Sequence, residues 1–227
     1  MRNLVFASIT FHISQEEKQN LWREQLYLQC FTQLLRVIPE NFDIVYCDNS
    51  VAGIQELLLE PLRQFLSGKR IFFLDRNIGG KNIGMGELDE LIYTSEQVDF
   101  KQYDKIVYLT SRRIIANPWI FEKVNGMVKK ALISNPDFIV LSSGNVYVDP
   151  VATEGLYNDM FFAMDSPTML EYIAYSRENI QKNLTNGIGS EQNLYNFIKS
   201  KEISYEWLSV LGLIRVDYKR GNEVQLF

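Results

Sequence analysis

The alternation of short apolar runs with longer amphipathic runs most limits how this chain can fold. The apolar runs are rich in β-branched and aromatic residues and are apolar throughout, so they predict strands that are buried on both faces. Strands of this kind, each followed by a helix, are typical of an α/β fold with a mainly parallel central sheet and helices on both faces. The predicted strands of the first half lie at 3–11, 42–50, 70–75 and 103–115.

Helices are predicted between these strands, at 14–38, 52–66 and 86–98. In the first helix, Ser14 followed by Glu17 has the spacing of a capping box. The second helix is kinked or interrupted at Pro61, because proline removes a backbone donor.

The second half mixes both kinds of element without a repeat or a linker, so we expect one domain over 1–227. Its predicted helices lie at 117–133 (Asn117 before Pro118), 166–184 (starting at Ser166 and Pro167) and 190–201 (Ser190 as N-cap). Its predicted strands lie at 137–149 (with a turn at Ser143 and Gly144), at 159–166 and, as a terminal strand or hairpin, at 205–220.

Composition argues against several classes of protein. The net charge of −5 disfavours binding to nucleic acid. The two cysteines, Cys30 and Cys47, give no disulfide framework, and with a single histidine they argue against structural zinc. No run of 18 apolar residues is present, so no membrane-spanning helix is expected. The apolar start of the chain is interrupted by polar residues and is interpreted as a strand, so we expect a cytoplasmic protein.

Polar side chains follow the apolar runs where the predicted strands end. In open α/β sheets, ligands bind outside the carboxyl ends of the strands, so we expect these side chains to form one polar rim. They are Thr10 and His12 after the first strand, Asp48 and Asn49 after the second, Asp75 and Asn77 after the third, Thr110, Ser111, Arg112 and Arg113 after the fourth, and Asp165 after a later strand.

The glycine-rich stretch at 76–92 departs from the common phosphate loops. Gly79 and Gly84 have the Walker A spacing, but Met85 stands where that motif needs lysine. The dinucleotide fingerprint lacks its third glycine and would have to follow the first strand, not the third. Two interpretations remain: a flexible loop before a helix, or a loop whose backbone N–H groups and Lys81 approach a diphosphate or a sugar.

These segments together resemble the nucleotide-sugar glycosyltransferases of the GT-A fold. The likeness rests on "LVFASIT", "DIVYCDNS", "RIFFLDRNIGGKNIGMGELDELI" and "YDKIVYLTSRRII", and later in the chain on "FFAMDSPTMLEYI" and "GSEQNLYNFI". It implies a Rossmann-like GT-A fold, with a nucleotide-sugar-binding half at 1–115 and an acceptor-side half at 116–227. The positions matching the family's donor-site segments are Thr10, Asp48, Asn49, Asn77, Gly79 and Gly84.

The resemblance implies transfer of a sugar from a UDP- or GDP-type donor to a glycan or a lipid-linked acceptor. The expected setting is cell-surface polysaccharide synthesis, in the cytoplasm or peripherally at the inner face of the membrane.

One departure from the family concerns the divalent cation. Most GT-A enzymes hold it with an Asp-x-Asp motif after the fourth strand, and this chain has none. Its "LTSRRII" is similar to a Thr-Gly-Arg-Tyr type motif, with Ser111 for glycine and Arg113 for tyrosine. We therefore predict no metal ligands and place Arg112 or Arg113 in the role of the metal. Binding of Mn²⁺ or Mg²⁺, and a surface arginine pair without function, stay as alternatives.

An inverting transferase needs a base for the acceptor hydroxyl, and the sequence offers Asp165 and Glu191. Each has a structural alternative, as a helix cap or a partner of the helix dipole. Two other functions also remain: a sugar nucleotidyltransferase and a catalytically degenerate nucleotide-sugar-binding module. Nucleotidyltransferases usually carry a glycine-rich loop directly after the first strand, and "SITFHIS" contains no glycine.

Overall fold

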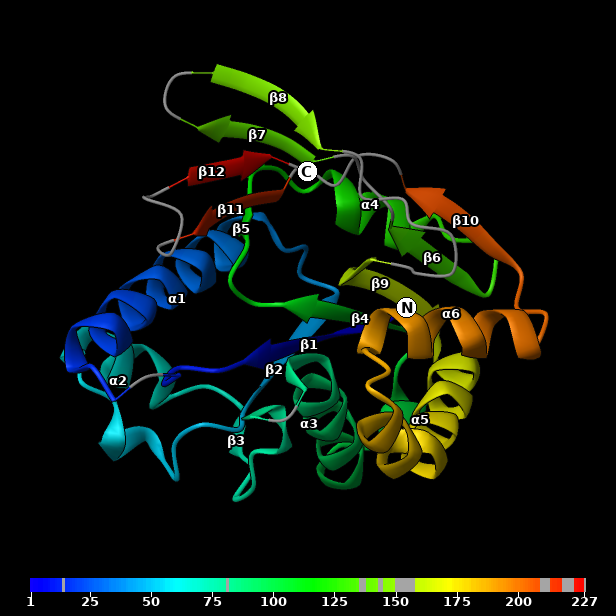
Figure 1. Cartoon of the computed structure of the whole chain (residues 1–227). Coiled ribbons are helices and arrows are strands. Elements are labelled where there is room, and N and C mark those ends of the chain that lie inside the picture. Colours follow the sequence, from blue (N-terminus) through cyan, green and yellow to red (C-terminus); the bar gives the residue numbers. More distant parts are fainter. Residues whose placement is uncertain are drawn as a thin grey trace.

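The structure is a computed structural model that describes residues 1–13, 15–80, 82–134, 138–142, 145–149, 158–208, 213–217 and 223–226. A seven-stranded sheet runs through the molecule in the order β10-β6-β9-β4-β1-β2-β3 (Figure 1). Every neighbouring pair is parallel except the two that involve β9. Its strands are β1 (Asn3–Ile9), β2 (Phe42–Asp48), β3 (Ile71–Phe73), β4 (Lys105–Thr110), β6 (Ala131–Ser134), β9 (Asn158–Asp165) and β10 (Tyr205–Leu208).

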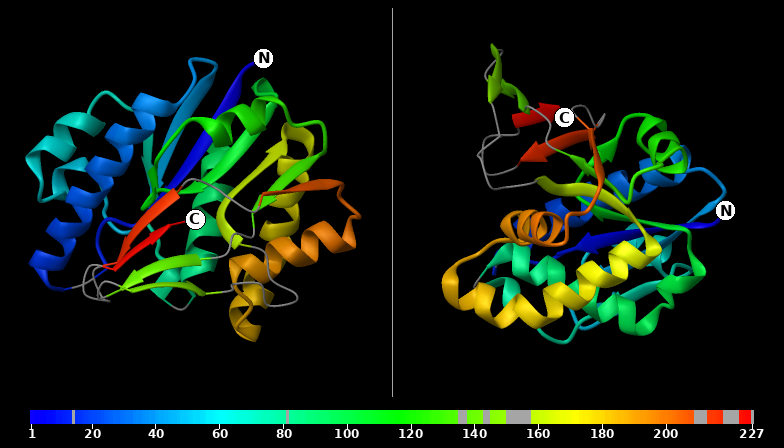
Figure 2. Two further views of the ribbon diagram at one scale, coloured as in Figure 1. Left: turned by 90° about the horizontal axis from the view of Figure 1, so that it is seen from above. Right: turned by 90° about the vertical axis from the view of Figure 1, so that its right-hand side faces the viewer.

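Helices cover both faces of this sheet, so the predicted α/β, mainly parallel architecture is confirmed (Figure 2). One face carries α3 (Ile83–Gln97), α5 (Ser166–Asn186) and α6 (Ser190–Ser200). The other carries α1 (Glu17–Val37), α2 (Glu60–Leu66) and α4 (Trp119–Asn125). Single 3₁₀ turns lie at η1 (Ile54–Glu56), η2 (Ile78–Gly80) and η3 (Phe100–Gln102).

Strand β1 shows why the apolar runs are continuous. Leu4 and Phe6 point to the α3/α5/α6 face, whereas Val5, Ala7 and Ile9 point to the face covered by α1, α2 and α4. All five side chains are buried. Both sides of the pleat are therefore core positions, and a buried polar side chain such as Ser8 needs a hydrogen-bond partner, which Glu90 provides.

A second, antiparallel sheet lies beside the first in the order β5-β11-β12-β7-β8 (Figure 1). It starts directly after the fourth strand of the chain, and β5 packs beside α1. The sequence predicted one long strand over 103–115, but the chain leaves the main sheet after Thr110. The strands of the second sheet are β5 (Ile114–Ile115), β7 (Phe138–Ser142), β8 (Asn145–Asp149), β11 (Leu213–Asp217) and β12 (Glu223–Leu226).

The predicted helix at 117–133 is wrong in its second half. Helix α4 ends at Asn125, and residues 131–134 form β6, buried between β9 and β10. Burial of Ala131, Leu132 and Ile133 on both faces of the sheet outweighs their helical propensity.

Two predicted helix caps are wrong. Helix α1 begins at Glu17, and its N-cap is Glu16 instead of Ser14, without a side-chain capping bond. The N-cap of α6 is Gly189 in place of Ser190. Helix α5 begins at Ser166 as predicted, and Asp165 caps it, as the structural alternative for that residue proposed. The predicted turn at 143–144 lies outside the described residues.

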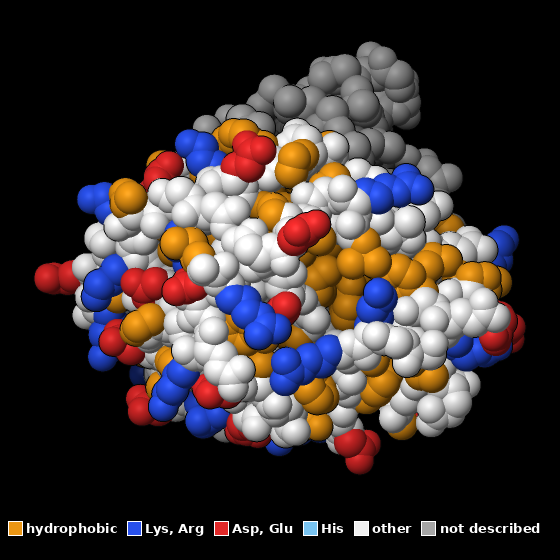
Figure 3. Space-filling model, turned by 180° about the vertical axis from the view of Figure 1, so that it is seen from behind, with side chains coloured by type: hydrophobic (Ala, Val, Ile, Leu, Met, Phe, Trp, Pro, Cys, Tyr) orange, Lys and Arg blue, Asp and Glu red, His pale blue; other side chains and the backbone are white. Residues whose placement is uncertain are grey.

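The surface mixes both signs of charge with apolar areas. On the face opposite to the view of Figure 1, hydrophobic side chains gather in one area that Lys and Arg side chains border (Figure 3). None of the described helices is long and apolar enough to cross a membrane.

The glycine stretch is anchored to α3 and α6. The Arg76 guanidinium makes two hydrogen bonds to the Asp89 carboxylate on α3, at 2.8 and 2.7 Å. Asn82 caps α3 by accepting from Met85 N, and its amide donates to Ile188 O, just before α6. A Cβ on Gly84 would lie 2.1 Å from Ser190 Oγ and 2.8 Å from Ser190 N, so glycine permits this close approach.

Replacing Gly84 with alanine should lower the free energy of unfolding by about 1–3 kcal/mol, because α3 and α6 must move apart. Gly80→Ala is the matched control, since a Cβ there meets nothing within 4 Å. Urea unfolding of both variants measures the difference. Equal stability of the two variants would show that the helices do not touch at this position.

Candidate functional site

A cavity of about 480 Å³ opens at the carboxyl ends of β1, β2 and β4. Its volume falls within the range of small-molecule sites, roughly 300–1,000 Å³. Helices α1 and α3 and the loop at η2 complete its wall. The lining residues are Ser8, Ile9, Thr10, His12, Ile13, Gln19, Trp22, Arg23, Tyr27, Asn49, Asn77, Gly79, Gly80, Ile83, Glu87, Thr110, Ser111 and Arg112.

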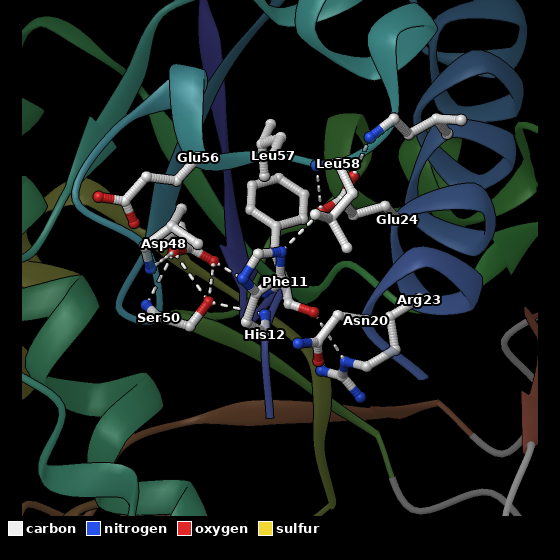
Figure 4. Close-up of polar contacts among 12 residues, drawn as sticks. Phe11, His12, Asn20, Arg23, Glu24, Asp48, Ser50, Glu56, Leu57 and Leu58 are labelled. Atoms are coloured by element: carbon white, nitrogen blue, oxygen red, sulfur yellow. Dashed lines mark hydrogen bonds and ion pairs between the residues drawn. The ribbon is translucent and has the colours of Figure 1, made fainter. Parts of the chain in front are cut away.

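Asp48 holds the ends of β1 and β2 together beneath this cavity (Figure 4). Its buried carboxylate accepts hydrogen bonds from the backbone N–H groups of Phe11, Ser50 and Val51, each at 2.8 Å. Burial raises the pKa of Asp48, and these donors partly offset that effect. Asp48 does not line the cavity, and its contacts shape the loops that do.

His12 and Glu24 form a second polar group (Figure 4). His12 Nε2 lies 2.6 Å from Glu24 Oε1, and its ring contributes to the cavity wall. The Glu24 carboxylate is fully buried and also accepts from the backbone N–H groups of Leu58 and Leu59. The pair therefore ties β1, α1 and the segment before α2 together, and it fixes the imidazole at the edge of the site.

Arg23 comes from the second turn of α1 and brings a positive charge to the cavity. Its guanidinium donates to the carbonyl oxygens of Thr10 and Phe11, which keeps it in place. Burial lowers the pKa of Arg23, and the charge of Arg112 acts in the same direction. Thr10 N donates to the Tyr27 hydroxyl at 2.9 Å, and Thr10 Oγ1 to Asn49 Oδ1 at 3.3 Å.

The side chains of the two adjacent arginines after β4 lie in different surroundings. Arg112 lines the cavity together with Thr110 and Ser111. Arg113 is buried away from it, with Nε 3.2 Å from Met160 Sδ and Nη1 donating to Arg112 O. Ser111 N continues the ladder by donating to Ser8 O.

The η2 loop contributes Asn77, Gly79 and Gly80 to the wall. A Cβ on Gly86 would lie 2.8 Å from the Gly79 Cα, so the loop lies directly on the first turns of α3. The predicted contact of Lys81 with a ligand falls on a residue outside the described part of the chain.

Two glutamates of α3 lie at or beneath the cavity. Glu87 lines it, and the Tyr108 hydroxyl donates to Glu87 Oε2 at 3.2 Å. Glu90 is fully buried one turn further on, where Ser8 Oγ donates to Glu90 Oε2 at 2.5 Å. Burial raises the pKa of both carboxyls, that of Glu90 well above its usual range.

Besides Asp48 and Arg113, four described residues proposed from the sequence lie outside the cavity wall. Asp75 is exposed after β3, and Gly84 packs on Ser190. Asp165 caps α5 by accepting from Thr168 N. Because β9 runs antiparallel to β4, Asp165 lies opposite Lys105 in the strand register, at the end of β4 remote from the cavity. The expectation that Asp165 shares the polar rim is therefore wrong. Glu191 lies in the first turn of α6, where its charge acts on Glu87, and it does not line the cavity.

Sequence reasoning missed the contributions of the helices. Trp22, Arg23 and Tyr27 lie in the first turns of α1, and Glu87 lies in the first turns of α3. A usable signal was present, because a helix that follows a parallel strand begins at the same sheet edge as the strand's carboxyl end.

The site does not fit the divalent cation expected of most GT-A enzymes. The end of β4 presents Ser111 and Arg112 in place of carboxylates. Among the described residues that line the cavity, only Glu87 carries a carboxylate. In the described part of the chain, no three His, Cys, Asp or Glu side chains gather in a way that would hold a metal ion.

Comparison with known proteins assigns the fold to a class. One similar solved structure is a "putative nucleotide-diphospho-sugar transferase" from Desulfovibrio desulfuricans G20, with a TM-score of 0.55 and 11 % identity over 92 % of this chain and 80 % of that one. Another is 4-diphosphocytidyl-2C-methyl-D-erythritol synthase from Anaerococcus prevotii DSM 20548, with a TM-score of 0.49 and 13 % identity over 97 % and 92 % of the two chains. No protein-family model and no curated protein sequence matches significantly. The chain thus has the Rossmann-like fold of nucleotide-diphospho-sugar transferases.

Asp48→Ala should lower the free energy of unfolding by about 3 kcal/mol or more, because three buried N–H groups lose their acceptor at about 1–3 kcal/mol each. Asp75→Ala, at the end of the neighbouring strand, should leave stability unchanged because its side chain is exposed. Urea unfolding at pH 7 compares the two. Wild-type stability of Asp48→Ala would contradict the structural role.

Proposed function

We propose that this chain is a glycosyltransferase that moves a sugar from a nucleoside-diphosphate sugar to a glycan or a lipid-linked acceptor. The observation that carries the proposal is the position of Arg112 in the cavity wall at the carboxyl end of β4. In this fold the diphosphate of a donor lies at that edge of the sheet. Arginine offers forked donors that match phosphate oxygens and carry a fixed positive charge.

The surrounding charges support binding of an anion. Arg23 faces the same cavity from α1, and the first turn of α3 adds the positive end of a helix dipole. The loop at Asn77, Gly79 and Gly80 adds no negative charge. The leaving nucleoside diphosphate gains negative charge as the glycosidic bond breaks, and Arg112 is placed to stabilise it without a metal ion.

The remainder of the assignment follows the sequence resemblance. All of the described residues that line the cavity lie within 1–115, so we assign donor binding to this half and the acceptor side to 116–227. UDP- or GDP-type donors, a cell-surface glycan or lipid-linked acceptor, and peripheral attachment at the inner membrane face stay predictions from the sequence.

A sugar nucleotidyltransferase is the main alternative with this fold. The loop after β1 disfavours it, because that loop contains no glycine and its backbone N–H groups already have partners. Phe11 N donates to Asp48, and His12 N donates to Ser50 Oγ. These two donors are therefore occupied and do not cradle a triphosphate. A degenerate module would bind a donor without cleaving it.

Calorimetry with UDP, GDP, CDP and dTDP should show one ligand that binds in the micromolar range. Its affinity should change less than threefold when EDTA replaces Mn²⁺, because arginine supplies the charge. CTP and UTP with Mg²⁺ serve as the test of the nucleotidyltransferase alternative, which predicts tighter binding of a triphosphate. If no nucleotide binds, the proposed function is wrong.

Arg112→Ala should weaken the binding of that diphosphate about tenfold to a hundredfold, because a charge-assisted hydrogen bond is worth about 1.5–3 kcal/mol. Arg112→Lys should recover part of the affinity by keeping the charge. The neighbour Arg113 is the matched control, since its buried side chain does not line the cavity, and Arg113→Ala should bind within threefold of wild type. Weaker binding by Arg113→Ala, with wild-type binding by Arg112→Ala, would show that Arg113 contacts the phosphate instead of Arg112.

A further inference from the structure

Glu87 differs from every other side chain that lines the cavity. It is the one carboxylate among the described lining residues, and it comes from the second turn of α3. Arg112 faces the same space from the end of β4. The cavity therefore pairs one group that can accept a proton with one that can stabilise an anionic leaving group.

The orientation of Glu87 is fixed by Tyr108. The Tyr108 hydroxyl donates to Glu87 Oε2 at 3.2 Å. The ring of Tyr108 is buried on β4 and stacks on Phe162, with centroids 4.6 Å apart and planes 9° apart. Phe6 packs on it at 5.5 Å. Packing fixes the Tyr108 ring, and the Tyr108 hydroxyl in turn fixes Oε2 of Glu87. The other carboxylate oxygen, Oε1 of Glu87, can then accept from a substrate hydroxyl.

The groups around Glu87 make it basic yet able to ionise. Burial raises the pKa of Glu87, whereas the positive charges of Arg112 and Arg113 and the hydrogen bond from Tyr108 lower it. Glu191, on α6, acts with burial and raises it further. Glu90 lies one turn along α3, where burial raises its own pKa well above the usual range for a carboxyl group. A base is most effective when its pKa lies near the working pH.

We propose that Glu87 is the general base of the transfer reaction, and that Glu191 acts through Glu87 as a positioning residue. This inference rests on the proposed function. The Glu87 carboxylate takes the proton of the acceptor hydroxyl, and the acceptor oxygen bonds to the anomeric carbon. The bond from that carbon to the β-phosphate oxygen breaks, and its electron pair leaves with the nucleoside diphosphate beside Arg112. The sugar configuration is inverted, and Glu87 later returns its proton to water.

The contact of α6 with α3 brings Glu191 close enough for its charge to act on Glu87. Gly84 lets the start of α6 approach closely, with Ser190 against the first turn of α3. Glu191 is the next residue, and its charge acts on Glu87 without itself lining the cavity. A like charge near a carboxylate disfavours ionisation, so Glu191 raises the basicity of Glu87.

The test uses the full chain and UDP-glucose, UDP-N-acetylglucosamine, GDP-mannose and dTDP-rhamnose, with water as the acceptor. Proton NMR follows cleavage of the donor that binds and reports the anomer that is released. Glu87→Gln should bind this donor within threefold of wild type and cleave it at least a hundredfold more slowly. Glu178→Gln, at an exposed position on α5, is the control and should behave as wild type.

The pH profile separates a catalytic role from a structural one. In the wild type, kcat/KM should fall at acidic pH as Glu87 takes up a proton, and this limb should be absent from Glu87→Gln. Glu191→Gln should keep donor affinity and move the limb to lower pH, because removing the like charge makes Glu87 easier to ionise.

Four results would overturn the inference while leaving donor binding intact. These are wild-type cleavage by Glu87→Gln, an unchanged acidic limb in that variant, release of the sugar with retained configuration, or a wild-type chain that binds donor and never cleaves it. Loss of affinity with unchanged kcat would make Glu87 a donor-binding residue instead. If the wild-type chain binds no nucleotide sugar, the proposed function fails first and the inference falls with it.

Discussion

The buried carboxylate of Asp48 is the interaction on which the site depends. Two parallel strands, β1 and β2, end side by side, and each must turn away while its last backbone N–H groups are still inside the protein. Asp48 accepts from Phe11 N at the end of one strand and from Ser50 N and Val51 N at the end of the other. A single side chain thereby satisfies three donors that burial would otherwise leave unpaired. The cavity wall at Thr10, His12 and Asn49 rests on this junction, so its shape is set before any ligand arrives.

Much of the fold could be predicted from the sequence because the apolar period is a local signal. Strands buried on both faces lack alternation, as β1 does, and they stand out from the helices between them. The failures involve choices that are not local. Residues 131–134 carry a pattern that suits either a helix or a buried strand. They form a strand because they pair with β9 on one side and β10 on the other, and these partners are distant in the sequence. The departure of the chain from the main sheet after Thr110 likewise depends on partners more than 90 residues away, in β11.

The residues of the candidate site could be predicted from the sequence only where the direction of the strand could be predicted as well. The rule that ligand groups follow the carboxyl ends of strands placed Thr10, Asn49, Asn77 and Arg112 together, and all four line the cavity. The rule misplaced Asp165, since β9 runs the other way and the sequence does not mark its direction. It also overlooked Glu87 and Arg23, which lie inside helices rather than at strand ends. Distinguishing Arg112 from Arg113 required the geometry of the strand end, where the alternation of a strand no longer applies.

The contacts around the glycine stretch make three elements behave as one piece. Arg76 binds Asp89 on α3, Asn82 binds the carbonyl of Ile188 before α6, and Gly84 seats Ser190 against α3. The loop therefore cannot slide over a ligand alone, as a hinged lid would. Any movement of residues 77–80 toward the strand ends has to carry α3 and the start of α6 with it. The cavity therefore lies between the ends of β1, β2 and β4 on one side and a single unit of the η2 loop, α3 and the start of α6 on the other, and this unit carries both Glu87, the proposed base, and Glu191, which acts on it.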